Sequence, residues 1–222
     1  MKISIDSKLA QTIPGFKIGV ITYKNIVVGA SPQMIKGRLQ LYQESIAIDL
    51  DSTPLADFKK GIQEWRQVFK QLGVDPSKYR PSHEALLRRV AKRQFLTTIH
   101  SAADINNFFS MQYGIPIGIY DADKLNGDLE IRLGRESESY EGLNNREIDA
   151  SGKLVSVDQT GPFGSPYVDA KRTAVTEETT SALQIVYLLA SMESEEAHEL
   201  LTAMSNMFTQ VNGGIANCSI EQ

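Results

Sequence analysis

The sequence contains few residues of the metal-binding and redox-active types. It has one cysteine, Cys218, and three scattered histidines among 222 residues. One cysteine cannot form a disulfide within the chain, and neither residue type recurs at the spacing of a zinc site. We therefore expect no metal and no cofactor. We interpret the histidines, His83, His100 and His198, as structural or surface residues.

Common catalytic signatures are also missing. The chain has no GxxxxGK[ST] phosphate loop, no Rossmann glycine pattern, no GxSxG elbow and no HExxH pair, so nucleotide, acyl-serine and zinc chemistries lack their usual residues. No segment approaches the roughly 18 apolar residues of a membrane span, and no apolar run follows the first lysine as it would in a secretory signal. We expect a soluble protein located in the cytoplasm.

Charge is unevenly distributed along the chain. The net charge is −4, but residues 59–93 hold ten basic and three acidic residues, which is +7 and leaves −11 for the remainder. Affinity for a phosphate backbone comes mostly from Lys and Arg. A basic helix face formed by Arg88, Arg89, Lys92 and Arg93 is therefore a candidate nucleic-acid contact. A solvated helix surface explains the same pattern equally well.

Hydrophobic periodicity predicts an α+β fold, with a helical N-terminal half and a sheet-rich C-terminal half. The apolar run at 179–190 does not distinguish helix from strand. We expect one domain, or two lobes covering about 1–115 and 116–222. The expected elements are a strand or hairpin at 16–28, helices at 32–48, 53–72, 82–93, 102–111 and 194–208, and antiparallel strands within 117–175.

A glycine- and proline-containing segment at 160–179, TGPFGSPYVDAKRTAVTEET, has the composition of a pocket-lining loop. Gly161 and Gly164 would leave backbone N–H groups open to an anion or a carbonyl oxygen. The side chains that would supply donors, acceptors and a base are Ser165, Asp169, Arg172, Thr173 and Glu177. A plain sheet connection with proline turns is the alternative interpretation.

Three segments in a fixed order carry a resemblance to a known family. They are RPSHEALLRRV at 80–90, DINNFFSMQYGIPIGIYDADKLNGDLEIRLG at 104–134, and the GPFGSP to VTEET stretch. Together they resemble the B3/B4 domain, the tRNA-proofreading part of the phenylalanyl-tRNA synthetase β subunit. The resemblance implies a mixed α/β fold whose cleft holds an amino-acid-like group. In the synthetase, that cleft hydrolyses tRNA carrying tyrosine in place of phenylalanine.

The family's pocket residues carry over only in part. Asn107 matches the pocket asparagine that ends the DxxN motif. Gly118 stands where the synthetase has a pocket histidine, and Ile185 stands where it has the glutamate that recognises the tyrosine hydroxyl. Loss of that acceptor disfavours tyrosine, because a buried hydroxyl without a partner costs roughly 1–3 kcal/mol. Gly118 would enlarge the cleft unless a neighbouring side chain fills the space.

Three functions follow from these observations. The first is an RNA-binding, editing-like hydrolase that acts in trans on aminoacyl-tRNA, with Asn107 and Thr173 positioning the substrate and Glu177 activating water. The second is a non-catalytic protein that binds an amino acid or another small molecule. The third is an interaction module with a vestigial cleft. We do not expect an aminoacyl-tRNA ligase, because this domain leaves no room in 222 residues for an ATP-dependent core.

Overall fold

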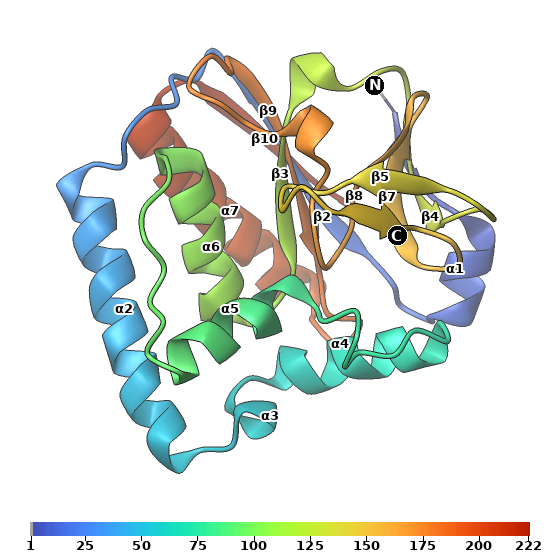
Figure 1. Cartoon of the computed structure of the whole chain (residues 1–222). Helices are drawn as coiled ribbons and strands as arrows, with labels where there is room; N and C mark the ends of the chain where they lie inside the picture. The colour runs from blue at the N-terminus through green and yellow to red at the C-terminus, as the bar shows by residue number, and fades with distance from the viewer. Residues whose placement is uncertain (1) are drawn as a thin grey trace.

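The computed structural model describes residues 2–222, which form two larger sheets, a small hairpin and a set of covering helices (Figure 1). The strands are β1 (Ile3–Ile5), β2 (Ile18–Lys24), β3 (Ile117–Asp121), β4 (Leu129–Leu133), β5 (Ser139–Glu141), β6 (Glu147–Asp149), β7 (Leu154–Asp158), β8 (Gly161–Gly164), β9 (Ser181–Tyr187) and β10 (Ile215–Glu221). The α-helices are α1 (Ser7–Thr12), α2 (Gln33–Ser52), α3 (Leu55–Phe58), α4 (Lys60–Gln71), α5 (Ser82–Ala91), α6 (Ser101–Tyr113) and α7 (Ser194–Asn212), and the 3₁₀ turns are η1 (Ala122–Lys124) and η2 (Lys171–Thr173).

The first sheet is antiparallel and has the strand order β10-β2-β9-β3. Its central strand β9 is buried along nearly its whole length, which explains why its sequence, SALQIVY, shows no clean alternation. β2 lies between β9 and β10, so strands from both ends of the chain share this sheet. β3 forms the opposite edge, where Tyr120 bridges to Ala174, and Ile119 of β3 lines the site described below.

The second sheet has the order β1-β4-β7-β8, in which only the β1–β4 pair is parallel. Hydroxyl groups link the two sheets internally: Ser156 Oγ on β7 lies 2.7 Å from Tyr187 Oη on β9. The predicted α+β class is confirmed. Sequence periodicity did not indicate β1, α1 or β10, because β1 and α1 are short and β10 is a largely exposed edge strand of mixed polarity.

Helices α6 and α7 pack against each other and against the first sheet (Figure 1). Gly19 on β2 permits this close packing, since a Cβ there would press against the Leu201 side chain of α7. Phe208 of α7 stacks on Tyr23 of β2 with ring centroids 4.0 Å apart. Such a ring pair contributes about 0.5–1.5 kcal/mol beyond the apolar area that it buries.

The single helix expected at 53–72 is in fact two helices. Lys59 adopts an extended conformation (φ −136°, ψ 130°) and separates α3 from α4. The break brings Gly61 directly against the Gly114 carbonyl, a contact that any Cβ at Gly61 would prevent. The apolar periodicity was nevertheless informative, because Ile62, Trp65 and Phe69 are buried as expected. Among the described helices, none is long and apolar enough to cross a membrane.

Candidate functional site

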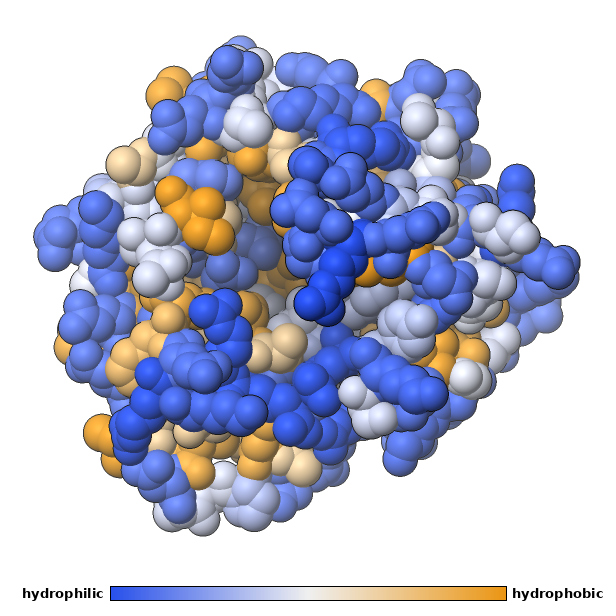
Figure 2. All heavy atoms as spheres, viewed as in Figure 1, coloured by the Kyte–Doolittle hydropathy of each residue, from blue (hydrophilic) through white to orange (hydrophobic). Residues whose placement is uncertain are grey.

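A cleft of about 580 Å³ lies between α6, β3 and the segment that follows η2. Figure 2 shows it as a hollow on this face, with apolar residues visible inside. The cleft is lined by Ile99, His100, Ala103, Asn106, Asn107, Ile119, Leu143, Asp169, Ala174, Val175, Thr176 and Glu177. Its lining residues therefore come from chain segments that are as much as 78 positions apart.

The DxxN motif builds the α6 side of the cleft. Asp104 is buried and fixes the incoming loop, since its carboxylate accepts hydrogen bonds from Ser31 Oγ at 2.5 Å and from the Ile99 backbone N–H at 3.0 Å. Asn106 donates to the Ile117 carbonyl at 3.0 Å and accepts from Gln184. The neighbouring Asn107 lines the cleft, and its amide group forms no hydrogen bond within residues 2–222. It is therefore available to a ligand.

The opposite wall is held by contacts between two motifs of the resemblance. Asp121, from the YDxDKL motif, accepts a hydrogen bond from Thr179 Oγ1 of VTEET at 2.7 Å. Lys124 donates to the Ala174 carbonyl at 2.8 Å and lies 3.2 Å from the Asp121 carboxylate. These bonds fasten the segment carrying Thr176 and Glu177 beside β3. The motifs thus specify the shape of the cleft.

A tyrosine–aspartate pair occupies the region where a larger pocket was expected. Tyr120 Oη donates to Asp169 Oδ1 at 2.7 Å. A Cβ at Gly118 or at Gly164 would collide with the Tyr120 hydroxyl, so both glycines are required by this ring position. Gly118 therefore does not enlarge the cleft, because a neighbouring side chain fills the space, the exception that the expectation allowed. That side chain is Tyr120, through its hydroxyl.

Asp169 has an unusual protonation equilibrium for a carboxyl group. Burial raises its pKa from 3.8 to about 7, although hydrogen bonds from Tyr120 and from the Ile119 backbone oppose this change. Burial also raises the pKa of Tyr120 well above its ordinary value, so that hydroxyl remains a donor. Near neutral pH, Asp169 can both accept and release a proton, which suits acid–base chemistry.

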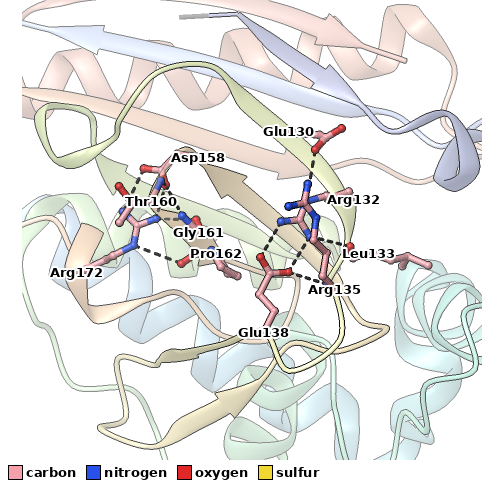
Figure 3. Close-up of polar contacts among 10 residues, drawn as sticks. All are labelled: Glu130, Arg132, Leu133, Arg135, Glu138, Asp158, Thr160, Gly161, Pro162 and Arg172. Atoms are coloured by element: carbon pink, nitrogen blue, oxygen red, sulfur yellow. Dashed lines mark hydrogen bonds and ion pairs between the residues drawn. The ribbon is translucent and has the colours of Figure 1, made fainter.

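Three other predicted substrate-binding residues lie away from this cleft. Ser165 and Thr173 are buried, and their hydroxyls bond the backbone carbonyls of Val168 and Phe163. Arg172 pairs with Asp158 at 2.7 Å and also donates to the Gly161 carbonyl (Figure 3). In this position it stabilises the β7–β8 turn.

The Gly161 N–H, which we expected to be open to an anion, instead donates to Asp158 Oδ1 at 3.1 Å. Figure 3 shows a second charged cluster on the same sheet, in which Arg132 pairs with Glu138 at 2.7 Å. The charged groups of this region therefore form ion pairs with one another.

The predicted basic face is partly neutralised, and α5 ends at Ala91, so Lys92 and Arg93 lie just beyond the helix. Glu84, whose side chain is fully buried, lies within 2.6 Å of Arg66, 3.4 Å of Arg80 and 2.8 Å of Arg88. Burial acts to raise the pKa of Glu84, but hydrogen bonds from Arg66 and Arg88 outweigh it, and the pKa is lowered.

The other three residues of that face differ from one another in their surroundings. Arg93 pairs with Asp51 at 2.6 Å. Arg89 and Lys92 line a groove of about 390 Å³ with Arg80, Arg88 and Gln94, and neither forms an ion pair within residues 2–222. They are the two cations best placed for an external phosphate.

His100 and Leu143 line the cleft but were not predicted as site residues. His100 Nδ1 accepts the Ala103 backbone N–H at 3.2 Å and so caps α6. In the neutral ring this leaves the proton on Nε2, as a donor. The sequence signal for His100 as a site residue was its position immediately before SAAD, because a capping side chain lies at the open end of a helix. No sequence signal placed Leu143 here.

Comparison with known proteins identifies the family. Residues 64–212 match the B3/4 domain. Over 214 residues, the chain is 35% identical to uncharacterized protein YhzB of Bacillus subtilis (strain 168), with 96% of each chain covered. The protein therefore belongs to the B3/B4 domain family, and the resemblance seen in its motifs is confirmed.

Shorter matches connect the family to a larger enzyme. The phenylalanine–tRNA ligase β subunit of Bartonella quintana (strain Toulouse) is 31% identical over 141 residues, which cover 62% of this chain and 16% of that subunit. The β subunit of Neisseria meningitidis serogroup B is 36% identical over 76 residues, or 34% and 10%. An N-terminal fragment of the phenylalanyl-tRNA synthetase β subunit from Pyrococcus horikoshii aligns with a TM-score of 0.49 at 14% identity, covering 99% of this chain and 50% of the fragment.

Proposed function

We propose that this protein binds an amino acid esterified to tRNA in the α6–β3 cleft and hydrolyses that ester in trans. The observation that carries the proposal is the placement of Asp169, a carboxyl group with a pKa of about 7, in one cleft with the unengaged amide of Asn107. Membership in a family shared with tRNA ligase β subunits supports the choice of tRNA. Neither feature alone would define a substrate.

The charge of the cleft supports an ester over a free amino acid. Its lining includes two carboxylates, Asp169 and Glu177, and no Lys or Arg among the described residues. The amides that open α6 are largely used, since Ser101 N–H donates to the Gly29 carbonyl and Ala103 N–H to His100. A free amino acid would bring an unpaired carboxylate, whereas an esterified one keeps only its ammonium group.

The hydrolysis step requires a positioned water and a proton acceptor. In the proposed reaction, water attacks the ester carbonyl carbon while Asp169 accepts its proton, and the C–O bond to the ribose then breaks as that oxygen regains a proton. Tyr120 holds Asp169 in place through its 2.7 Å hydrogen bond. Asn107 and the Nε2–H of His100 are available donors for the carbonyl oxygen.

Glu177 remains the alternative base predicted from sequence. It lies on the same cleft, but it is exposed, whereas Asp169 is half-buried and burial raises its pKa to about 7. The comparison of Asp169→Asn with Glu177→Gln therefore separates the two assignments. The predicted roles of Gly118, Ser165, Arg172 and Thr173 become supporting ones in this proposal: they fix the loop that carries Asp169.

The tRNA would contact the groove on α5, which packs against α6. Arg89 and Lys92 would meet phosphates directly. Arg88 and Arg93, which already have acidic partners, would contribute less. Such contacts are expected to weaken as salt rises, because phosphate binding releases counterions.

A second function is favoured by one specific contact. Asp169 already accepts hydrogen bonds from Tyr120 and the Ile119 backbone, an arrangement that also suits a fixed acceptor for an ammonium group. The protein would then bind an amino acid derivative without turnover. This candidate shares the ligand group but not the chemistry.

The experiment is the release of amino acid from a panel of correctly and incorrectly charged tRNAs, using purified full-length protein at low and moderate salt. We expect release from a restricted set of charged tRNAs, lost in Asp169→Asn and weakened by salt. Absence of release from every tRNA in the panel would contradict the hydrolase and leave the binding function.

A further inference from the structure

The outward face of α2 carries a stripe of large apolar side chains. Met34, Leu41 and Ile48 are 54%, 68% and 64% exposed. They follow one another at intervals of seven residues, which brings each back to within about 20° of the same direction on a helix. The opposite face of α2 is buried in the core through Ile35, Leu39, Gln43, Ile46 and Ala47.

The two halves of this face differ in shape. Beside the N-terminal half lies an open, mainly apolar groove of about 700 Å³, lined by Gln33, Met34, Gly37, Arg38, Leu41, Tyr42 and Phe108. Gly37 leaves the groove open, since a Cβ there would meet nothing within 4 Å. At the C-terminal half, Ile48 projects into solvent. One half therefore has a hollow, and the other has a side chain that could fill it.

The two halves also differ in charge. On this face the N-terminal half carries Arg38, whereas the C-terminal half carries Glu44 and Asp49. Lys36 lies about 140° from Leu41 around the helix, and Asp51 already pairs with Arg93. Two such helices in antiparallel orientation bring the basic half of each alongside the acidic half of the other. Their helix dipoles are then opposed as well, which is the favourable arrangement.

We propose that α2 is the interface of a two-fold symmetric homodimer, in which the α2 helices of two copies pack antiparallel and centred on Leu41. The symmetry places Ile48 of the second copy over the Gly37 groove and pairs the two Leu41 side chains. A two-fold interface must be complementary to itself, and this face meets that requirement in shape, hydrophobicity and charge. A single helix per copy makes a small interface, so the dimer is reversible and concentration-dependent.

Sedimentation equilibrium of the full chain across a range of concentrations tests the proposal. Wild type is expected to shift from monomer to dimer as concentration rises, and Leu41→Glu to remain monomeric. Ile215→Glu is the matched control, since Ile215 is also exposed (59%) but lies on β10; it should behave as wild type. Circular dichroism confirms that both variants are folded. A wild type that stays monomeric throughout, or a Leu41→Glu variant that still dimerises, would overturn the proposal.

Disulfide trapping in a Cys218→Ser background tests the orientation. Leu41→Cys should cross-link to itself, and an equal mixture of Met34→Cys and Ile48→Cys chains should cross-link to each other. Met34→Cys alone should not, because the two positions would lie about 21 Å apart in the antiparallel pair, beyond disulfide reach. Self-linking of Met34→Cys and of Ile48→Cys would show a parallel pair and overturn the inference.

Discussion

The α6–β3 cleft and the basic face of α5 both hold clustered polar groups, but they use them in opposite ways. Around α5, the buried Glu84 forms ion pairs with three arginines, and Asp51 pairs with Arg93. In the cleft, the Asn107 amide has no partner within residues 2–222, and no cation lies beside the half-buried Asp169 among the described lining residues.

The comparison shows that the number of charges does not measure functional capacity. Around α5, the more highly charged region, most of the charged groups pair with one another, because a buried carboxylate must be balanced by nearby cations. The cleft has few charges, but its Asn107 and Asp169 side chains can still interact with a ligand. We therefore expect variants of Glu84 and its arginine partners to affect mainly stability and variants in the cleft to affect mainly ligand chemistry.

The largest effect on stability is expected from Glu84→Gln. Removing the buried charge leaves Arg66, Arg80 and Arg88 without their acidic partner. Because these three side chains are 30–42% exposed, we expect a cost of about 1–3 kcal/mol, that of losing hydrogen bonds to a charged group. Glu64→Gln is the control, because it breaks only the surface pair with Lys60 at 3.2 Å, worth about 0–1 kcal/mol. Urea unfolding measures both. Similar losses in the two variants would contradict the distinction between buried and surface charge.

The pH dependence of that stabilisation has a defined sign. The pKa of Glu84 lies below its ordinary value of 4.5 in the folded protein. Its contribution is therefore fully present above pH 4.5 and is lost as the pH falls through the lowered value.

In the cleft, Asp169→Asn is expected to reduce ester hydrolysis by about 100-fold or more, the usual effect of removing a general base. Glu177→Gln should change the rate by no more than a few-fold, because Glu177 is exposed at the cleft. Both rates are measured as single-turnover release of amino acid from a charged tRNA that the wild-type protein hydrolyses. The reverse order of effects would assign the base to Glu177.

Asp169 should also make folding stability depend on pH in the direction opposite to Glu84. Its folded pKa is raised from 3.8 to about 7, so its contribution is fully present below pH 3.8 and is lost as the pH rises through 7. At pH 8, Asp169→Asn should melt about 2–4 °C above wild type, the shift that roughly 1 kcal/mol produces in a protein of this size. The difference should shrink toward pH 4.5. A constant difference across this range would contradict the raised pKa.

The smallest expected effect concerns salt. Replacing Arg89 or Lys92 with Ala should lower the slope of log affinity for tRNA against log salt by about 1 for each lost phosphate contact. Arg93→Ala, which removes a cation already paired with Asp51, should change it less. Filter binding from low to moderate salt measures the slope. Equal changes in the three variants would mean that ion pairing on α5 does not decide which cations bind.

Sequence reasoning recovered much of the fold because local periodicity dictates it. The buried stripe of α4 and the start of α7 follow directly from apolar spacing. The break at Lys59 could not be read in this way, since it depends on contact between Gly61 and Gly114, 53 positions apart. Pairing of β10 with β2 depends likewise on residues from opposite ends of the chain.

The candidate site was predictable only where motifs carried it. Asn107, Asp169 and Glu177 were all named from sequence and all line the cleft. The Tyr120–Asp169 hydrogen bond, with 49 positions between its partners, had no local signal. Because this bond was not foreseen, Gly118 suggested a larger cleft, whereas the missing side chain at this position leaves room for the Tyr120 hydroxyl. Arg172 had the right chemistry for a ligand but is engaged by Asp158.

The most direct test of the cleft assignment is calorimetric binding of amino acids joined to adenosine through a non-hydrolysable 3′-amide, compared with the free amino acids across all twenty side chains. If the cleft receives an esterified amino acid, at least one conjugate should bind tenfold or more tightly than its free amino acid. Asn107→Ala, which removes an amide available to the ligand, should weaken that binding by about tenfold, or 1.4 kcal/mol. Equal binding of free and conjugated forms, or unchanged binding by Asn107→Ala, would contradict the account.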